Sequence, residues 1–144
     1  MKSANLLYKK VYGCLIGGLI GDAMGAPVEG WHYEKIYENR LMTIMCDSRE
    51  TVPCALALFH LAGGNPEKAI IYAANFGRDA DTIATMVGAV SGAYAGVDGL
   101  RRKWVEEIQK SSPEQENLTN KLIEVIEKKY NEVNVVMNSY KKLC

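Results

Sequence analysis

The sequence has neither an excess of charge nor a long apolar run. Lys plus Arg and Asp plus Glu each number 17, so the formal net charge is zero. Without surplus positive charge, the chain is not expected to bind nucleic acid or an anionic membrane through bulk charge. The longest uncharged run, residues 82–97, is shorter than the roughly 18 residues that a membrane span needs. We therefore expect no nucleic-acid partner and no membrane partner.

Signals of an exported protein are also missing. Lys9 and Lys10 precede an apolar stretch, but residues 21–22 (Gly-Asp) interrupt it, and no convincing small-residue cleavage site follows. The four cysteines form no Cys-x-x-Cys pair. A chain of 144 residues can bury a core without disulfides, so free thiols are expected. These features predict a cytoplasmic protein.

Strand signals are weak, because there is no sustained alternation of apolar and polar residues and no Asn-Gly hairpin turn. Apolar residues instead recur at helical spacing. We therefore predict an all-α fold, a compact helical bundle that forms a single domain over residues 1–144. The helices are expected at residues 5–20, 51–63, 65–76, 83–94, around 104, and within 112–144 as one long C-terminal helix.

The first predicted helix is rich in glycine, which permits close packing against another helix. The glycines expected to form this flat face are Gly13, Gly17 and Gly18. The expected apolar stripe consists of Leu7, Val11, Leu15 and Leu19. Further glycines and Pro27 predict a turn over residues 21–31. The helix predicted at 83–94 is also rich in small residues and is expected to lie at the centre, with Gly96 closing it.

Asp79, Asp81 and Thr82 stand together where this central helix begins. Two carboxylates and a hydroxyl so close together offer oxygen ligands to a hard cation such as Mg²⁺, which would also relieve the repulsion between the two charges. The alternative is that Asp79 or Asp81 caps the helix, which is the commoner role of aspartate at such a position. Spacing alone leaves both interpretations open.

A second acidic pair, Asp22 and Glu29, lies in the glycine-rich segment that follows the first helix. These carboxylates could line a site. Alternatively, Asp22 satisfies backbone donors of the turn and Glu29 is solvated. Arg78, beside Asp79, could contact a phosphate group or only water. Chemistry alone favours the structural interpretation of the acidic pair.

Two segments resemble motifs of the ADP-ribosylglycohydrolase family. Residues 13–29, GCLIGGLIGDAMGAPVE, are similar to its opening motif, and residues 75–84, NFGRDADTIA, are similar to its closing motif. Residues 51–62 and 65–74 also resemble the segments that precede the closing motif. The resemblance covers residues 11–104, and the two motifs stand in the family's order.

This resemblance implies an all-α fold, a site with two Mg²⁺ ions, and hydrolysis of the bond from the ADP-ribose anomeric carbon to a protein or small molecule. It implies that Asp79, Asp81 and Thr82 are metal ligands. Glu29 matches the acidic residue beside the substrate that is implicated in the reaction. Gly77 and Arg78 match the substrate-binding part of the closing motif. Asp22 matches an acid of mainly structural role.

The chain departs from the family in its middle. Family members are longer and carry a Ser/Thr-Asp-Asp-Thr motif between the two ends, whereas this sequence contains no Asp-Asp pair. The missing part would lie between residues 38 and 47, which implies one Mg²⁺ ion rather than two. The expectation is a hydrolase of ADP-ribosylated proteins or ADP-ribose-like small molecules. The alternatives are an inactive nucleotide-binding member, or a protein that acts through a partner or as a homo-oligomer, which would cover apolar faces left by the shortening.

Overall fold

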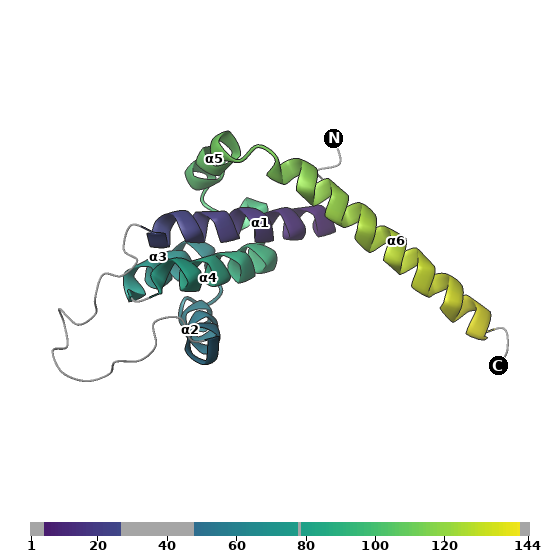
Figure 1. The fold of residues 1–144 in the computed structure, drawn as a ribbon, viewed down its shortest axis with the longest axis horizontal. Helices are drawn as coiled ribbons and strands as arrows, with labels where there is room; N and C mark the ends of the chain where they lie inside the picture. Colours follow the sequence, from purple (N-terminus) through teal and green to yellow (C-terminus); the bar gives the residue numbers. More distant parts are fainter. Residues whose placement is uncertain (1–4, 27–47, 78, 142–144) are drawn as a thin grey trace.

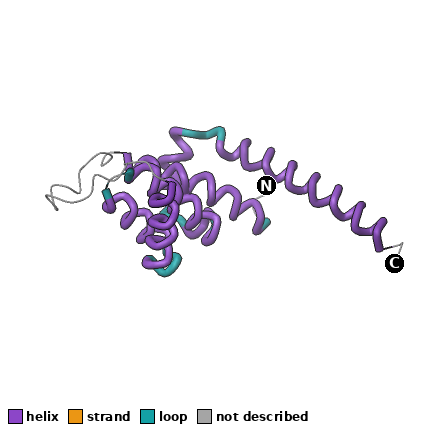
Figure 2. The backbone as a smooth tube through the Cα atoms, turned by 60° about the horizontal axis from the view of Figure 1, so that its bottom comes forward, coloured by secondary structure: helices purple, strands orange, loops and turns teal. Residues whose placement is uncertain are grey.

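The computed structural model describes residues 5–26, 48–77 and 79–141. Within these ranges all regular elements are helices, which confirms the all-α prediction (Figure 2). The elements in chain order are α1 (Leu6–Gly25), α2 (Ser48–Leu61), α3 (Pro66–Phe76), α4 (Ala80–Ala95), a 3-10 turn η3 (Val97–Gly99), α5 (Arg102–Ser111) and α6 (Gln115–Lys141).

Helices α1 and α4 lie side by side at the centre and run antiparallel (Figure 1). Glycines let their backbones touch. A Cβ atom built on Gly17 would lie 2.1 Å from the carbonyl oxygen of Gly88, and one built on Gly92 would lie 1.8 Å from that of Gly13. The predicted glycine face is therefore confirmed for Gly13 and Gly17, whereas a Cβ atom on Gly18 would make only ordinary contacts. The central position of α4 is also confirmed. Gly96 ends α4, as expected, and its N–H donates to the Gly92 carbonyl.

The turn predicted from residue 21 is wrong for its first part, because α1 continues to Gly25. Gly21 and Gly25 extend the contact with α4. A Cβ atom at Gly21 would lie 1.9 Å from the carbonyl oxygen of Ala84, and one at Gly25 would lie 2.5 Å from that of Ala80. These glycines serve close helix packing rather than chain reversal. Residues 27–31 of the predicted turn lie outside the described residues.

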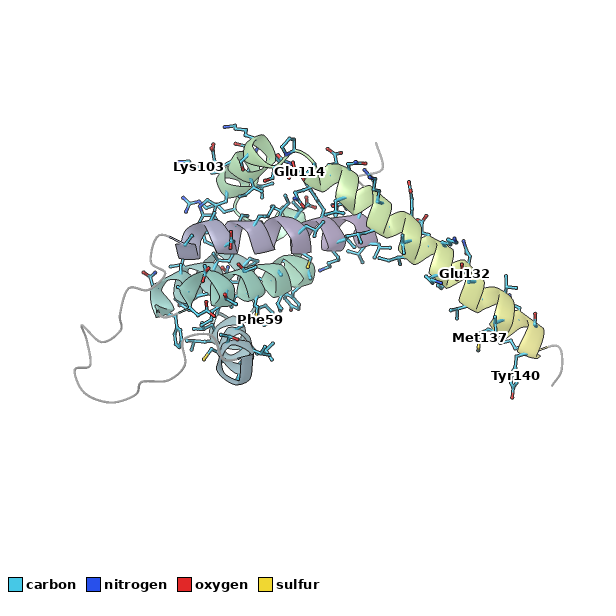
Figure 3. All side chains as sticks on the ribbon, in the orientation of Figure 1. Phe59, Lys103, Glu114, Glu132, Met137 and Tyr140 are labelled. Atoms are coloured by element: carbon cyan, nitrogen blue, oxygen red, sulfur yellow. The ribbon has the colours of Figure 1, made fainter. Side chains whose placement is uncertain are left out.

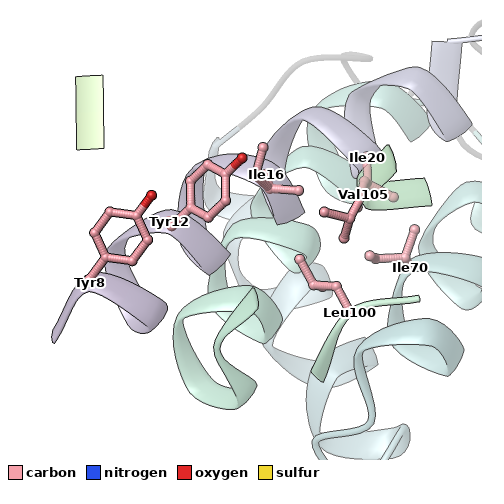
Figure 4. Close-up of a cluster of buried hydrophobic side chains, with 7 residues drawn as sticks. All are labelled: Tyr8, Tyr12, Ile16, Ile20, Ile70, Leu100 and Val105. Carbon is pink, nitrogen blue, oxygen red and sulfur yellow. The ribbon is translucent and has the colours of Figure 1, made fainter. Parts of the chain in front are cut away.

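The apolar stripe predicted for α1 is displaced by one position. Leu7, Val11, Leu15 and Leu19 are only partly buried. The buried apolar side chains are instead Tyr8, Tyr12, Ile16 and Ile20. Both sets recur every four residues, so periodicity alone could not choose between them. The choice follows from packing, since this set meets Ile70, Leu100 and Val105 in one core cluster (Figure 4).

A second core cluster joins α2, α3 and α4 on the other side of the bundle. It consists of Ala55, Ala62, Ala69, Ala73, Ile83, Ala84 and Val87. Helix α3 has a side-chain cap at its start: Asn65 Oδ1 accepts a hydrogen bond of 2.9 Å from the N–H of Lys68, and Pro66 occupies the first turn. Helix α2 begins at Ser48, before the predicted start, so Pro53 lies inside the helix rather than in its first turn.

Helix α6 packs on α1 near its own beginning and then projects away from the bundle (Figure 1). Thr119 is fully buried at this junction, and its hydroxyl donates to the Gln115 carbonyl at 2.7 Å. Ile123 packs partly against the Tyr8 cluster. In the described part of the chain, no helix is both long and apolar enough to cross a membrane.

Candidate functional site

The connection between α3 and α4 positions the predicted closing motif. Helix α3 ends at Phe76 and α4 begins at Ala80. Gly77 has φ 77° and ψ −164°, a backbone conformation that is essentially restricted to glycine. This conformation turns the chain sharply out of α3. Asp79 therefore stands directly at the start of α4.

Asp79 occupies the N-cap position of α4, but its side chain makes no capping hydrogen bond. Its backbone carbonyl accepts the first helical hydrogen bond, from the N–H of Ile83 at 3.0 Å. The side chain is nevertheless buried, with a relative exposure of 8% for the residue. The interpretation of Asp79 as a side-chain helix cap is therefore wrong. Its carboxyl group contacts neighbouring side chains instead.

The surroundings of Asp79 disfavour its charged form. Burial raises the pKa of the Asp79 carboxyl, and the contact with the neighbouring Asp81 carboxyl raises it further. A hydrogen bond with the Thr82 side chain opposes both effects and lowers the pKa, but the net direction is upward. A hydrogen bond between two carboxyl groups requires a shared proton. A cation placed between them would satisfy the same oxygens.

The end of α1 lies against this part of α4. Asp81 Oδ1 accepts a hydrogen bond from the Thr82 N–H at 2.7 Å. The hydroxyl of Thr85, one turn further along, donates to the main-chain oxygen of Asp81 at 2.7 Å and lies 3.4 Å from Asp22 Oδ1. The prediction that Asp22 satisfies donors of a turn is wrong, because Asp22 lies in helix α1. Its exposed carboxylate faces the site from the opposite helix.

The described residues include only part of the predicted site. Gly77, Asp79, Asp81 and Thr82 lie together at the junction of α3 and α4. Glu29 and Arg78 lie outside the described residues, so their assigned roles stay predictions. Thr85 was missed from the sequence. Its position four residues after Asp81 places it on the same face of the helix, and this spacing is the signal that could have found it.

The oxygen donors at the start of α4 have the chemistry that suits Mg²⁺. Asp79, Asp81 and Thr82 offer two carboxylates and a hydroxyl, the oxygen ligands that Mg²⁺ prefers, and Mg²⁺ commonly completes its shell with water. In the described ranges, no three or more His, Cys, Asp or Glu side chains gather closely enough to hold a metal ion. Asp22 therefore does not complete a three-carboxylate shell.

The sequence pattern of the ADP-ribosylglycohydrolase family matches residues 3–49 and 40–132. These segments include both predicted motifs and five of the six α-helices in full, with the beginning of α6. The chain therefore belongs to the ADP-ribosylglycohydrolase family. This membership confirms the resemblance noted in the sequence, and the helical architecture agrees with it.

Individual relatives match over short stretches. The protein YegU of Escherichia coli is 45% identical over 51 residues, which cover 35% of this chain and 15% of that protein. The ADP-ribosylhydrolase ARH3 of Homo sapiens is 47% identical over 38 residues, which cover 26% of this chain and 10% of that protein. The ARH3 of Gallus gallus is 38% identical over 61 residues, 42% of this chain and 16% of that protein. The chain thus spans only a small part of these relatives, and no solved structure matches it.

The raised pKa of Asp79 predicts that its ionisation costs stability. The unfolded chain ionises this group near pH 4, whereas the fold holds it neutral to a higher pH. The cost is therefore absent at pH 3, grows as the pH rises through both pKa values, and is complete above the folded value. Asp79→Asn is expected to raise the free energy of unfolding at pH 7 and to change it little at pH 3.

Urea denaturation in the presence of EDTA measures this difference. Asp98→Asn is the control, because Asp98 is exposed and pairs with Lys9 away from the site. A loss of stability on Asp79→Asn at pH 7 would contradict the prediction.

Proposed function

We propose that this chain is an Mg²⁺-dependent hydrolase of an ADP-ribosyl N- or O-glycosidic bond. One observation supports the proposal: the buried Asp79, with Asp81 and Thr82, lies against the end of α1, the helix that contains most of the opening motif. The two motifs of the family are far apart in the sequence, but they meet at one end of the α1–α4 pair. Family membership supports the chemical assignment.

Each residue has a defined task in this proposal. Asp79, Asp81 and Thr82 would hold one Mg²⁺ ion. When bound, the ion would supply positive charge to orient the ribose hydroxyls and to acidify a water molecule. Glu29, four positions after the end of α1 in the sequence, accepts the proton of the attacking water. Gly77 and Arg78 contact the phosphate groups of the substrate.

The reaction is a simple hydrolysis. The oxygen of water forms a bond to the anomeric carbon of the ribose, and the bond from this carbon to the leaving nitrogen or oxygen breaks. One proton of the water passes to the carboxylate, and the leaving group gains a proton. The substrate class is an ADP-ribosylated protein or an ADP-ribose-like small molecule in the cytoplasm.

Calorimetric titration with Mg²⁺ tests the metal part of the proposal. We expect saturable binding by the unmodified chain, and its loss in the double variant Asp79→Ala/Asp81→Ala. Asp98→Ala is the matched control, because it also removes an aspartate but lies on η3 rather than at the site. Binding that persists in the double variant would place the metal elsewhere. No binding by the unmodified chain, with or without ADP-ribose, would overturn the hydrolase proposal.

The second candidate is a family member that binds an ADP-ribose-like nucleotide without hydrolysing it. The observation in its favour is that the described acidic residues offer a donor set for one ion, with no third carboxylate joining it. Release of ADP-ribose from an ADP-ribosylated arginine or serine peptide separates the two candidates. Release that depends on Mg²⁺ and on Glu29 supports the hydrolase, whereas ADP-ribose binding without release supports the second candidate.

A further inference from the structure

An apolar stripe runs along the part of α6 that projects from the bundle. We call it the α6 stripe and define it by Leu122, Ile126, Tyr130, Val133, Met137 and Tyr140, whose relative exposures range from 38% to 67%. Their spacings of three or four residues place them on one side of the helix. Figure 3 shows Met137 and Tyr140 projecting from the same side of its far end.

The α6 stripe is not the surface that attaches α6 to the bundle. That contact involves Thr119 and Ile123, near the beginning of the helix. Beyond it, no described helix covers the stripe (Figure 1). With about half of each large side chain exposed, the stripe presents on the order of 600 Å² of apolar surface, at the upper end of the range for the largest patch on a typical monomer. It approaches the roughly 800 Å² that each partner contributes to a standard interface.

The distribution of charge along α6 favours a second copy of the same helix as the partner of the stripe. The first half, residues 115–127, has three Glu and one Lys and therefore a net charge of −2. The second half, residues 128–141, has three Lys and one Glu and therefore a net charge of +2. When two identical α6 helices lie antiparallel, the negative half of each helix lies beside the positive half of the other. The helix dipoles then also oppose each other favourably.

We propose that two copies of this chain associate through their α6 stripes, with the α6 helices antiparallel. The same stripe on both copies makes a two-fold symmetric interface, which in the charge-matched register is centred on residue 128 and places Ile126 of one copy opposite Tyr130 of the other. The antiparallel arrangement holds the two bundles at opposite ends of the helix pair. The interface is far from Asp79 and Asp81, because α6 packs at the Tyr8 end of α1. It is therefore independent of the proposed hydrolysis.

Sedimentation equilibrium of the full chain tests the association. We expect a dimer at micromolar concentration, and dissociation constants at least ~10-fold weaker for Val133→Glu, which buries a charge in the interface. Val135→Glu is the matched control, since Val135 is also exposed but lies two residues, or about 200°, around the helix. A monomeric unmodified chain, or equal weakening by both variants, would overturn the proposal. Circular dichroism checks that both variants keep their helices.

The orientation has its own test. In the antiparallel dimer, spin labels at residue 139 lie about 11 residues from the two-fold axis in each copy, or ~33 Å apart along the helix pair. Parallel helices would bring the labels to within roughly 15 Å. The variant is Ser139→Cys in a chain whose four cysteines are replaced by serine. A distance below roughly 15 Å between the two labels, measured by electron paramagnetic resonance, would overturn the antiparallel arrangement, whatever the result for Mg²⁺ binding.

Discussion

Gly17→Ala is expected to unfold the bundle or to lower its free energy of unfolding by about 3 kcal/mol or more. The new Cβ atom would lie 2.1 Å from the carbonyl oxygen of Gly88, which belongs to the backbone of α4. A backbone atom cannot rotate away as a flexible side chain can. The clash is relieved only if α1 and α4 separate along the contact that forms the centre of the fold. Thermal and urea denaturation followed by circular dichroism measure the loss.

The adjacent residue provides the control for this prediction. A Cβ atom on Gly18 would lie 3.7 Å from the Cβ of Ala89, which is an ordinary contact. Gly18→Ala is therefore expected to be tolerated, and the better helix propensity of alanine adds up to about 1 kcal/mol. The two variants have the same composition and the same change in propensity. Equal stabilities for the two would show that α1 and α4 do not meet at Gly17 and Gly88.

Gly77→Ala is expected to cost about 1–3 kcal/mol, because alanine must adopt φ 77° and ψ −164° to keep the connection between α3 and α4. The alternative is that the connection changes its path. Asp79 would then move relative to Thr82, and the proposed Mg²⁺ affinity would fall with the stability. Denaturation and calorimetric titration measure the two effects in the same protein.

Gly63→Ala is the control that distinguishes a displacement of Asp79 from a general loss of stability. Gly63 also has a positive φ, of 61°, but it lies in the turn between α2 and α3, with no atom near the position of its missing Cβ. This variant is expected to lose about 1–2 kcal/mol and to keep the Mg²⁺ affinity unchanged. If Gly77→Ala and Gly63→Ala leave metal binding equally intact, Gly77 does not position the site.

Several parts of the fold could be predicted because they depend on neighbours in the sequence. The cap of α3 uses Asn65 and a backbone N–H three residues later, so local sequence is sufficient. The same is true of the end of α4 at Gly96. The packing face of α1 could not be predicted from the local sequence in this way. A glycine such as Gly21 predicts a turn as readily as a close helix contact, and only the backbone of α4 decides between the two.

The site also combines features that the local sequence predicts with contacts that only helix packing creates. Asp79, Asp81 and Thr82 are close because they are neighbours in the chain, so their grouping was visible in the sequence. The contact of Asp22 with Thr85 spans 63 residues and exists because α1 and α4 pack in one register. The burial that raises the Asp79 pKa has the same origin, since solvent is excluded by helices and not by the motif itself.

By itself the sequence determined the helical fold class, the family and the grouping of Asp79, Asp81 and Thr82, since periodicity, motif spacing and chain adjacency are local properties. Tertiary structure alone decided which of two equally periodic faces of α1 is buried and that Asp22 meets the start of α4. It also decided that the apolar stripe of α6 is left uncovered by the described helices. Burial depends on which surfaces meet in space. The sequence of an amphipathic helix shows which side is apolar, but it does not show which surface covers that side.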